Sequence, residues 1–324
     1  MNKQNNVVVG LTLVSLICLV AAYFAPIWWV SLTAPNYPAD AFPDGIRIHF
    51  HFDGVYNGCK VAGKGSRMAN EIIQKDLEHD DERYNPILDA GKNLDKGAEG
   101  LDCVHEMNTI NHYVGMYPIA TGAPVEKPLA KFFFGFFAVM MLAFMLPRKK
   151  PRLIVLAVGF AAVAAWMLVD QFVLGHLASH IANYTAESGR YFKKLERIKA
   201  WGDNVDLVSR IVIFSLIGLM LVVIAGVARI RNFQLLLVLV PALLPVFFVI
   251  TYAGWLWFFG HNLDPMGAFT VKPFMPTVFG EGKVAQFSTY SYPYWGYGLL
   301  VVIFVCLMLA LLIRRKQLRE GSAE

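Results

Sequence analysis

The sequence predicts a mainly α-helical, polytopic membrane protein with six transmembrane helices and a small α/β insert between the first and second helices. Three observations favour this fold class. Hydrophobic residues make up 56% of the 324 positions, and the mean hydropathy of +0.47 is higher than soluble domains have. Long apolar runs recur along the chain. Basic residues gather in alternate segments between these runs, as in polytopic membrane proteins.

Six apolar runs are each near the length of about 20 residues that a helix needs to cross a bilayer core. These runs cover residues 7–31, 129–147, 153–175, 209–228, 233–258 and 294–313. The first run is too long for the hydrophobic region of a cleaved signal peptide, and no A-x-A-like site follows it. We therefore interpret it as an uncleaved signal anchor.

The basic residues of the short segments predict the orientation in the membrane. If the N-terminus is cytoplasmic, the cytoplasmic segments contain the acids Glu320 and Glu324 and a larger set of basic residues: Lys3, Arg148, Lys149, Lys150, Arg152, Arg229, Arg231, Arg314, Arg315, Lys316 and Arg319. This pattern predicts that both termini are cytoplasmic in a bacterial inner (cytoplasmic) membrane. The basic stretch 190–199 is an exception on the periplasmic side, and its amphipathic pattern predicts a segment on the membrane surface.

The predicted spans divide the chain into four parts. They are a signal-anchor helix over 1–31, a periplasmic insert over 32–128, a five-helix membrane bundle over 129–313 with periplasmic loops 176–208 and 259–293, and a cytoplasmic tail over 314–324. The cytoplasmic parts are short connectors, so the function is expected in the membrane or the periplasm.

Two classes of ligand are not expected. The stretch GCKVAGKG (58–65) resembles a phosphate-binding loop, but Gly65 stands where that loop needs Ser or Thr to hold magnesium. No nucleotide is therefore predicted. The isoelectric point near 8.9 is explained by the basic cytoplasmic segments, so no nucleic acid is predicted either.

Two elements of the insert follow from its hydrophobic pattern. Residues 45–59 alternate apolar and polar side chains, which predicts a strand with His49 and His51 on its polar face. Residues 66–79 space their apolar side chains as a helix does. The insert is long enough for a small core of its own.

The densest group of possible metal ligands lies in LDCVHEMNTINHYVGM (101–116). Alternation over 101–107 predicts a second strand with its soft ligands on one face. Imidazole, thiolate and thioether together suit copper, whereas zinc rarely takes thioether. The predicted copper ligands are Cys103, His105, Met107, His112 and Met116, and His49 and His51 would complete the site or receive the ion. The alternative is that the histidines bond backbone groups and the methionines fill packing gaps.

The four cysteines fall into two groups. Cys18 and Cys306 lie within predicted spans, where small apolar packing explains them. Cys59 and Cys103 both lie in the insert, and in an oxidising compartment they are a candidate disulfide. Metal–thiolate chemistry is the alternative, and a thiol pair can also switch between the two states.

Polar residues near the periplasmic ends of the spans offer a second kind of site. His176 and His180 are four residues apart, and His261 follows the fifth span. His176 and His180 are candidate copper ligands, and the alternatives are a polar pair at the interface or ligation of haem b, for which His261 is a further candidate. Asp170 lies inside the third span, and an acid there is a candidate proton relay.

Two segments resemble a known family. TINHYVGMYPI (109–119) and FGHNLDPMGAFTVKPFMPTVFGEGKVAQFSTYSYP (259–293) resemble the NosB-like multispan membrane proteins found in gene clusters of the atypical (clade II) nitrous oxide reductases. The resemblance covers about a third of the chain. It implies a denitrification context, in which a periplasmic copper enzyme needs copper delivery, electrons and maturation.

The sequence therefore predicts an inner-membrane copper-binding accessory protein, or metallochaperone, rather than an enzyme. Its expected partners are the lipid bilayer and a periplasmic cuproenzyme such as nitrous oxide reductase. Two alternatives stay open. One is an electron-transfer subunit, linked to quinol or haem b, that feeds a periplasmic reductase. The other is a metal-free docking scaffold.

Overall fold

The structure is a computed structural model that describes residues 3–37, 39, 42–59, 102–119, 122–230, 232–268, 271–284 and 286–321. The predicted helix 66–79 and residues 60–65 of the glycine-rich stretch lie outside the described residues.

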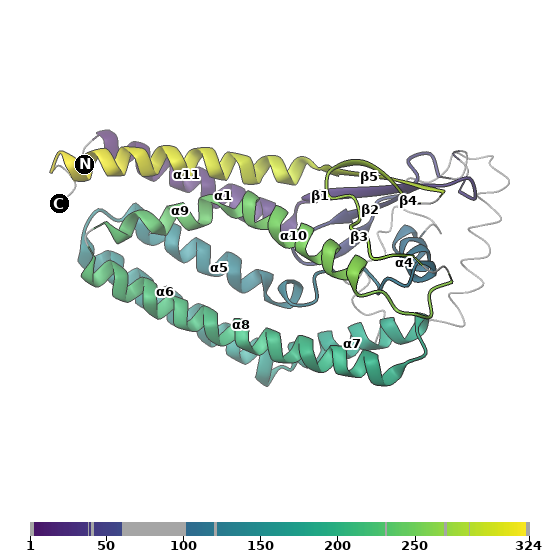
Figure 1. Cartoon of the computed structure of the whole chain (residues 1–324). Coiled ribbons are helices and arrows are strands. Elements are labelled where there is room, and N and C mark those ends of the chain that lie inside the picture. The colour runs from purple at the N-terminus through teal and green to yellow at the C-terminus, as the bar shows by residue number, and fades with distance from the viewer. Residues whose placement is uncertain are drawn as a thin grey trace.

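The described residues contain six helices that are long and apolar enough to cross a membrane. They are α1 (Lys3–Phe24), α5 (Glu126–Met145), α6 (Lys149–Leu168), α8 (Leu195–Arg229), α10 (Leu244–His261) and α11 (Trp295–Arg319). The helices form an elongated bundle, with a small sheet at one end and both chain termini at the opposite end (Figure 1). The prediction of a mainly helical chain with six such helices is confirmed.

The boundaries of two spans differ from the prediction because of proline. The first helix ends at Phe24, just before Pro26, and Trp28–Thr33 then form a strand. The fifth span is interrupted. A 3₁₀ turn, η2 (Phe233–Leu235), and a short helix, α9 (Leu236–Ala242), precede α10. Pro241 and Pro245 flank the break. Proline has no backbone N–H group to donate, so the hydrogen bonding of the helix is interrupted there.

The basic stretch 190–199 forms the bend of a helical hairpin, and its place on the membrane surface stays a prediction. Helix α7 (His176–Tyr191) and helix α8 form a hairpin, and these residues supply the end of α7, a short turn and the start of α8. A π-helical turn, η1 (Val169–Val173), and Gly175 with φ of 72° connect α6 to α7.

The sheet joins two segments that are far apart in the sequence. Its strands are β1 (Trp28–Thr33), β2 (Ile46–Phe50), β3 (Val55–Asn57), β4 (Gly280–Val284) and β5 (Phe287–Pro293). All neighbours are antiparallel, in the order β3-β2-β1-β5-β4. Central β1 therefore pairs with β2 on one side and with β5, from the last long loop, on the other. The described strands of the insert therefore share one sheet with the last long loop.

Residues 103–107 do not form a strand, and that prediction is wrong. They begin helix α4 (Cys103–Tyr113), which packs on β2. The Asp102 carboxylate caps the helix by accepting the backbone N–H groups of Val104 and His105, each at 3.0 Å. Over five residues the alternation suits a strand, but the buried positions Cys103, Met107 and Ile110 recur at helical spacing.

Candidate functional site

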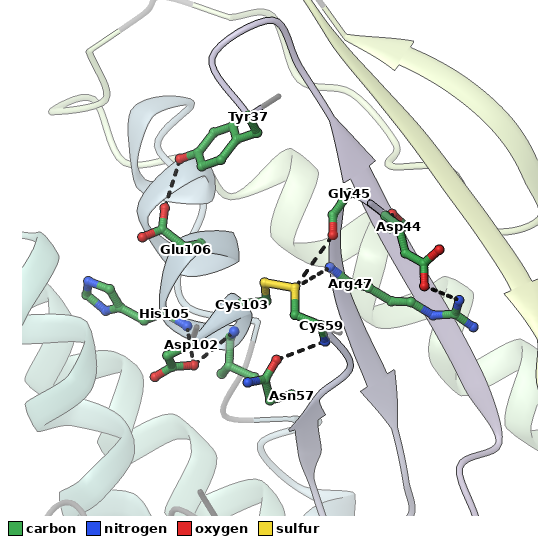
Figure 2. The surroundings of a disulfide bond; sticks show 12 residues. Tyr37, Asp44, Gly45, Arg47, Asn57, Cys59, Asp102, Cys103, His105 and Glu106 are labelled. Atoms are coloured by element: carbon green, nitrogen blue, oxygen red, sulfur yellow. Dashed lines mark hydrogen bonds and ion pairs between the residues drawn. A yellow bond between two sulfur atoms is a disulfide. The ribbon is translucent and has the colours of Figure 1, made fainter. Parts of the chain in front are cut away.

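A disulfide joins Cys59, just after β3, to Cys103, the first residue of α4 (Figure 2). The two Cα atoms are 6.0 Å apart and 44 positions separate the cysteines in sequence. The Cys59 backbone N–H donates to Asn57 Oδ1 at 3.0 Å, which fixes the end of β3. The bond ties α4 to the sheet and leaves Cys103 with no exposed surface.

Three sulfur-containing residues pack in one apolar cluster beneath the sheet, and we call Cys59, Cys103 and Met107 the sulfur cluster. Met107 follows Cys103 by one turn of α4, so the two side chains lie on one helical face. Met107 is 4% exposed and belongs to the same apolar cluster as Cys103, against which Cys59 packs. The other buried members of that apolar cluster are Leu32, Phe42, Ile46, Ile48 and Ile110.

A small apolar cavity of about 80 Å³ adjoins the sulfur cluster. It lies between the sheet, α4 and α10, and both Met107 and Met116 line it. The structure thus brings these two predicted ligands to one cavity. Met116 is itself 3% exposed and packs in a second apolar cluster with Phe192 and Phe259.

The histidines of α4 face a different neighbour. His105 Nδ1 lies 3.2 Å from the hydroxyl of Tyr191, at the end of α7, and Figure 2 shows the His105 ring directed away from the disulfide. The His112 ring is 5.6 Å from the Tyr191 ring and 5.1 Å from the Phe192 ring. Burial lowers the pKa of His112, although the nearby Asp264 charge opposes this. The helical geometry therefore separates these imidazoles from the sulfur cluster.

The strand histidines also lie apart from the sulfur cluster. Ile46 and Ile48 point toward α4, so His49, which alternates with them on β2, faces the other side of the sheet. There its ring stacks on Tyr294 at 5.0 Å. His51 follows β2, with its ring 4.4 Å from the Tyr56 ring. Burial lowers the pKa of His51, partly offset by Asp53.

Asp170 forms the centre of a polar cluster at the sheet-proximal end of the bundle. Its Oδ1 atom is 2.7 Å from Lys131 Nζ and 3.0 Å from His176 Nδ1, and its Oδ2 accepts from Gln171 Nε2 at 2.6 Å. Asp170 is buried within η1, whereas the His176 side chain is 55% exposed. Sequence reasoning found Asp170 but missed Lys131. A lysine inside an apolar run was the available signal, because such residues are rare in spans and usually paired.

The other two candidate haem ligands, His180 and His261, lie at hydrogen-bond distance from different backbone carbonyl groups. His180 Nε2 lies 2.8 Å from the carbonyl oxygen of Pro124. Burial, together with the Lys127 charge, lowers the pKa of His180 to about 4. His261 Nδ1 lies 2.8 Å from the Trp257 carbonyl oxygen, and its ring stacks on Trp257 at 4.5 Å. Haem ligation by His176, His180 and His261 stays a prediction.

Of the seven predicted copper ligands, the structure brings Cys103 and Met107 together, with Met116 on the adjoining cavity. It adds Cys59 as the disulfide partner and separates the four histidines from this group. Within the described ranges, no three side chains from His, Cys, Asp and Glu lie close enough to hold a metal ion, a test that does not count methionine.

Together these features define a polytopic, membrane-type helical protein with a disulfide-linked sheet at one end of the bundle. No protein-family model matches the chain, and no curated protein or solved structure matches it. The functional argument therefore rests on the residues themselves.

Proposed function

We propose that the protein binds Cu(I) through the sulfur cluster when the disulfide is reduced, and passes the ion to a periplasmic cuproenzyme. The observation that carries the proposal is the shared position of Cys59, Cys103 and Met107 in one buried cluster beside an apolar cavity. Two thiolates and a thioether form a soft donor set, which favours Cu(I) over hard cations.

The disulfide makes binding dependent on the redox state. A dithiol reductant transfers two electrons and two protons to the Cys59–Cys103 bond, which becomes two thiols while the reductant becomes a disulfide. Each thiol releases its proton when it binds the metal, since thiolate is the ligand. Met107 needs no deprotonation. The oxidised protein offers a single thioether from this cluster and is expected to hold copper weakly.

The choice of recipient rests on the resemblance of segments 109–119 and 259–293 to NosB-like proteins. In that context the recipient is nitrous oxide reductase, and the sulfur cluster faces the periplasm of a bacterial inner membrane. The ion would pass from the cluster toward Met116 through the small apolar cavity that Met107 and Met116 both line. Thioethers along such a path bind Cu(I) and release it readily.

The first experiment measures Cu(I) binding to the detergent-purified full chain in each redox state. The background variant Cys18→Ser/Cys306→Ser leaves Cys59 and Cys103 as the only cysteines. We expect about one Cu(I) per chain after anaerobic reduction, and at least about tenfold weaker binding by the oxidised protein, in competition with a colorimetric Cu(I) chelator.

Variants test whether the sulfur cluster is the site. In the reduced background, Cys59→Ser/Cys103→Ser is expected to abolish tight binding, and Met107→Leu to weaken it by about tenfold. Met220→Leu is the matched control, because Met220 on α8 is buried like Met107 but packs in a different apolar cluster. Equal Cu(I) binding by the double serine variant would overturn the proposal.

A second candidate, the electron-transfer subunit, is favoured by one observation. The Asp170–His176 pair lies beside residues that face outward from the bundle, among them Val173 and Leu174, which are 76% and 62% exposed. Such a pair can accept a proton from a quinol at the membrane surface. An optical spectrum of the purified protein tests for haem b. If neither copper nor haem binds, the docking scaffold is the remaining candidate.

A further inference from the structure

Two arginines are buried at the end of the bundle opposite the sheet. Arg152 lies in the first turn of α6 and Arg314 lies near the end of α11, and they are 5% and 1% exposed. Figure 1 shows that these helix ends lie near the chain termini. Arginine is rarely buried unless an anion pairs with it, so this pair needs a physical explanation.

Both guanidinium groups converge on the last residues of α5 and the turn after it. Arg152 donates to the Leu146 carbonyl oxygen from Nη2 at 2.7 Å and from Nε at 3.2 Å, and to the Pro147 carbonyl oxygen at 3.1 Å. Arg314 donates to the Phe144 carbonyl oxygen at 3.4 Å and to Gln317 Oε1 at 3.1 Å. Both guanidinium groups therefore donate to one short segment, residues 144–147.

The acceptors around the pair do not balance its charge. Neither guanidinium forms an ion pair within the described part of the chain, and Arg314 Nε is buried there without an acceptor. The C-terminus of α5 contributes about half a negative charge through its dipole, against two full positive charges. Glu320, the described acid nearest in sequence to Arg314, contacts Lys316 instead, at 3.8 Å.

We infer that Arg152 and Arg314 form a binding site for a phosphate-bearing anion, which in a membrane is the headgroup of an anionic lipid. Guanidinium groups match phosphate oxygens in geometry and charge. Basic pockets between helices at one membrane face are known to take such headgroups. Exposed basic residues surround the buried pair and would attract the lipid: Arg148, Lys149, Lys150, Arg315, Lys316 and Arg319. The inference does not depend on copper binding.

The experiment compares the thermal stability of the purified full chain in mixed micelles. The added probes are phosphatidylglycerol, phosphatidylcholine and inorganic phosphate at equal phosphate concentration. A larger rise in Tm with phosphatidylglycerol than with the other two supports a lipid headgroup. An equal rise with inorganic phosphate supports the anion site but assigns it to soluble phosphate. No rise with either anion overturns the inference.

Variants locate the site. Arg152→Gln and Arg314→Gln are expected to lose most of the rise caused by phosphatidylglycerol, while Arg315→Gln, an exposed neighbour, keeps it. The lipid-dependent difference is compared, rather than Tm itself, because removing a buried arginine also changes stability. Native mass spectrometry of bound lipid gives a second readout. If Arg315→Gln loses as much lipid as Arg314→Gln, the attraction is a diffuse surface effect and the site is refuted.

Discussion

At the scale of single residues, Asp170 is a carboxylate buried at the end of a membrane-type helix. A carboxylate that is 5% exposed needs partners, and Lys131, His176 and Gln171 supply them. The π-helical turn that carries Asp170 adds a residue to the helix and is a feature found often at functional sites. Whether this cluster moves protons or stabilises the bundle is open to a direct test.

Asp170→Asn is expected to destabilise the protein by about 1–3 kcal/mol, because Lys131 then keeps its charge without a carboxylate. The measurement is equilibrium unfolding in detergent. Lys131→Met/Asp170→Asn should recover part of the loss. Asp206→Asn is the control, since Asp206 pairs with the solvent-exposed Arg210 on α8, and exposed ion pairs of this kind add little to stability. An unchanged free energy of unfolding in Asp170→Asn would contradict the structural role and favour a proton relay.

At the scale of elements, helix α7 is held against the start of α5 through His180. The Nε2–H group of the neutral imidazole donates to the Pro124 carbonyl oxygen at 2.8 Å. The pKa of His180 in the folded protein, about 4, is below its unfolded value of 6.5. The folded state therefore binds fewer protons than the unfolded state between these values, so stability falls as pH decreases from about 6.5 toward 4.

His180→Gln is expected to flatten this pH dependence while keeping a donor for Pro124. The check is Tm measured at several pH values between 7 and 5, compared with the parent chain. His261→Gln, at the exposed end of α10, should leave the slope unchanged. A slope in His180→Gln as steep as in the parent would assign the pH dependence to the other histidines whose pKa is lowered, His51 and His112.

At the scale of the whole molecule, the sheet connects the first and last membrane-type helices. Strand β1 follows α1 directly and β5 leads directly into α11. The Trp28 indole N–H donates to Ser291 Oγ at 2.8 Å across this pair, and Ser291 in turn donates to the Val278 carbonyl oxygen. The register pairs Trp28 with Pro293 and Leu32 with Thr289. The sheet therefore holds the end of α1 next to the start of α11.

A fragment covering residues 26–128 is expected not to fold when secreted alone, because one side of central β1 would lack its partner β5. Circular dichroism and resistance to proteolysis are the measurements. The matched control appends residues 278–294 through a flexible linker and should gain protection. A protected, cooperatively unfolding 26–128 fragment would show that the insert is independent after all.

Part of the fold could be predicted because it depends on local patterns. Apolar length predicted the six helices, since a bilayer needs about 20 apolar residues per span. Period-two alternation predicted one strand at 45–59, whereas the structure divides this stretch into an antiparallel pair, Ile46–Phe50 and Val55–Asn57. The same logic misassigned residues 103–107, because five residues are too few to separate a period of two from a period of 3.6.

The candidate site was only partly predictable, because its members come from separate segments. The cysteine pair and Met107 could be named from their chemistry. Their shared position depends on α4 packing beneath β2, and His49 was assigned to the same set although β2 turns it to the other face. The ion pair between Lys131 and Asp170 likewise depends on how α5 packs against α6 and η1.

The sequence alone therefore determined the class of protein, the number of apolar helices and the soft-ligand content of the sheet end. These follow from composition and local period, which tertiary contacts do not change. Only the tertiary structure decided that the insert and the last loop share one sheet, that the sulfur atoms separate from the imidazoles, and that two arginines meet at the opposite end. Such contacts join residues far apart in the chain, and local propensity carries no information about them.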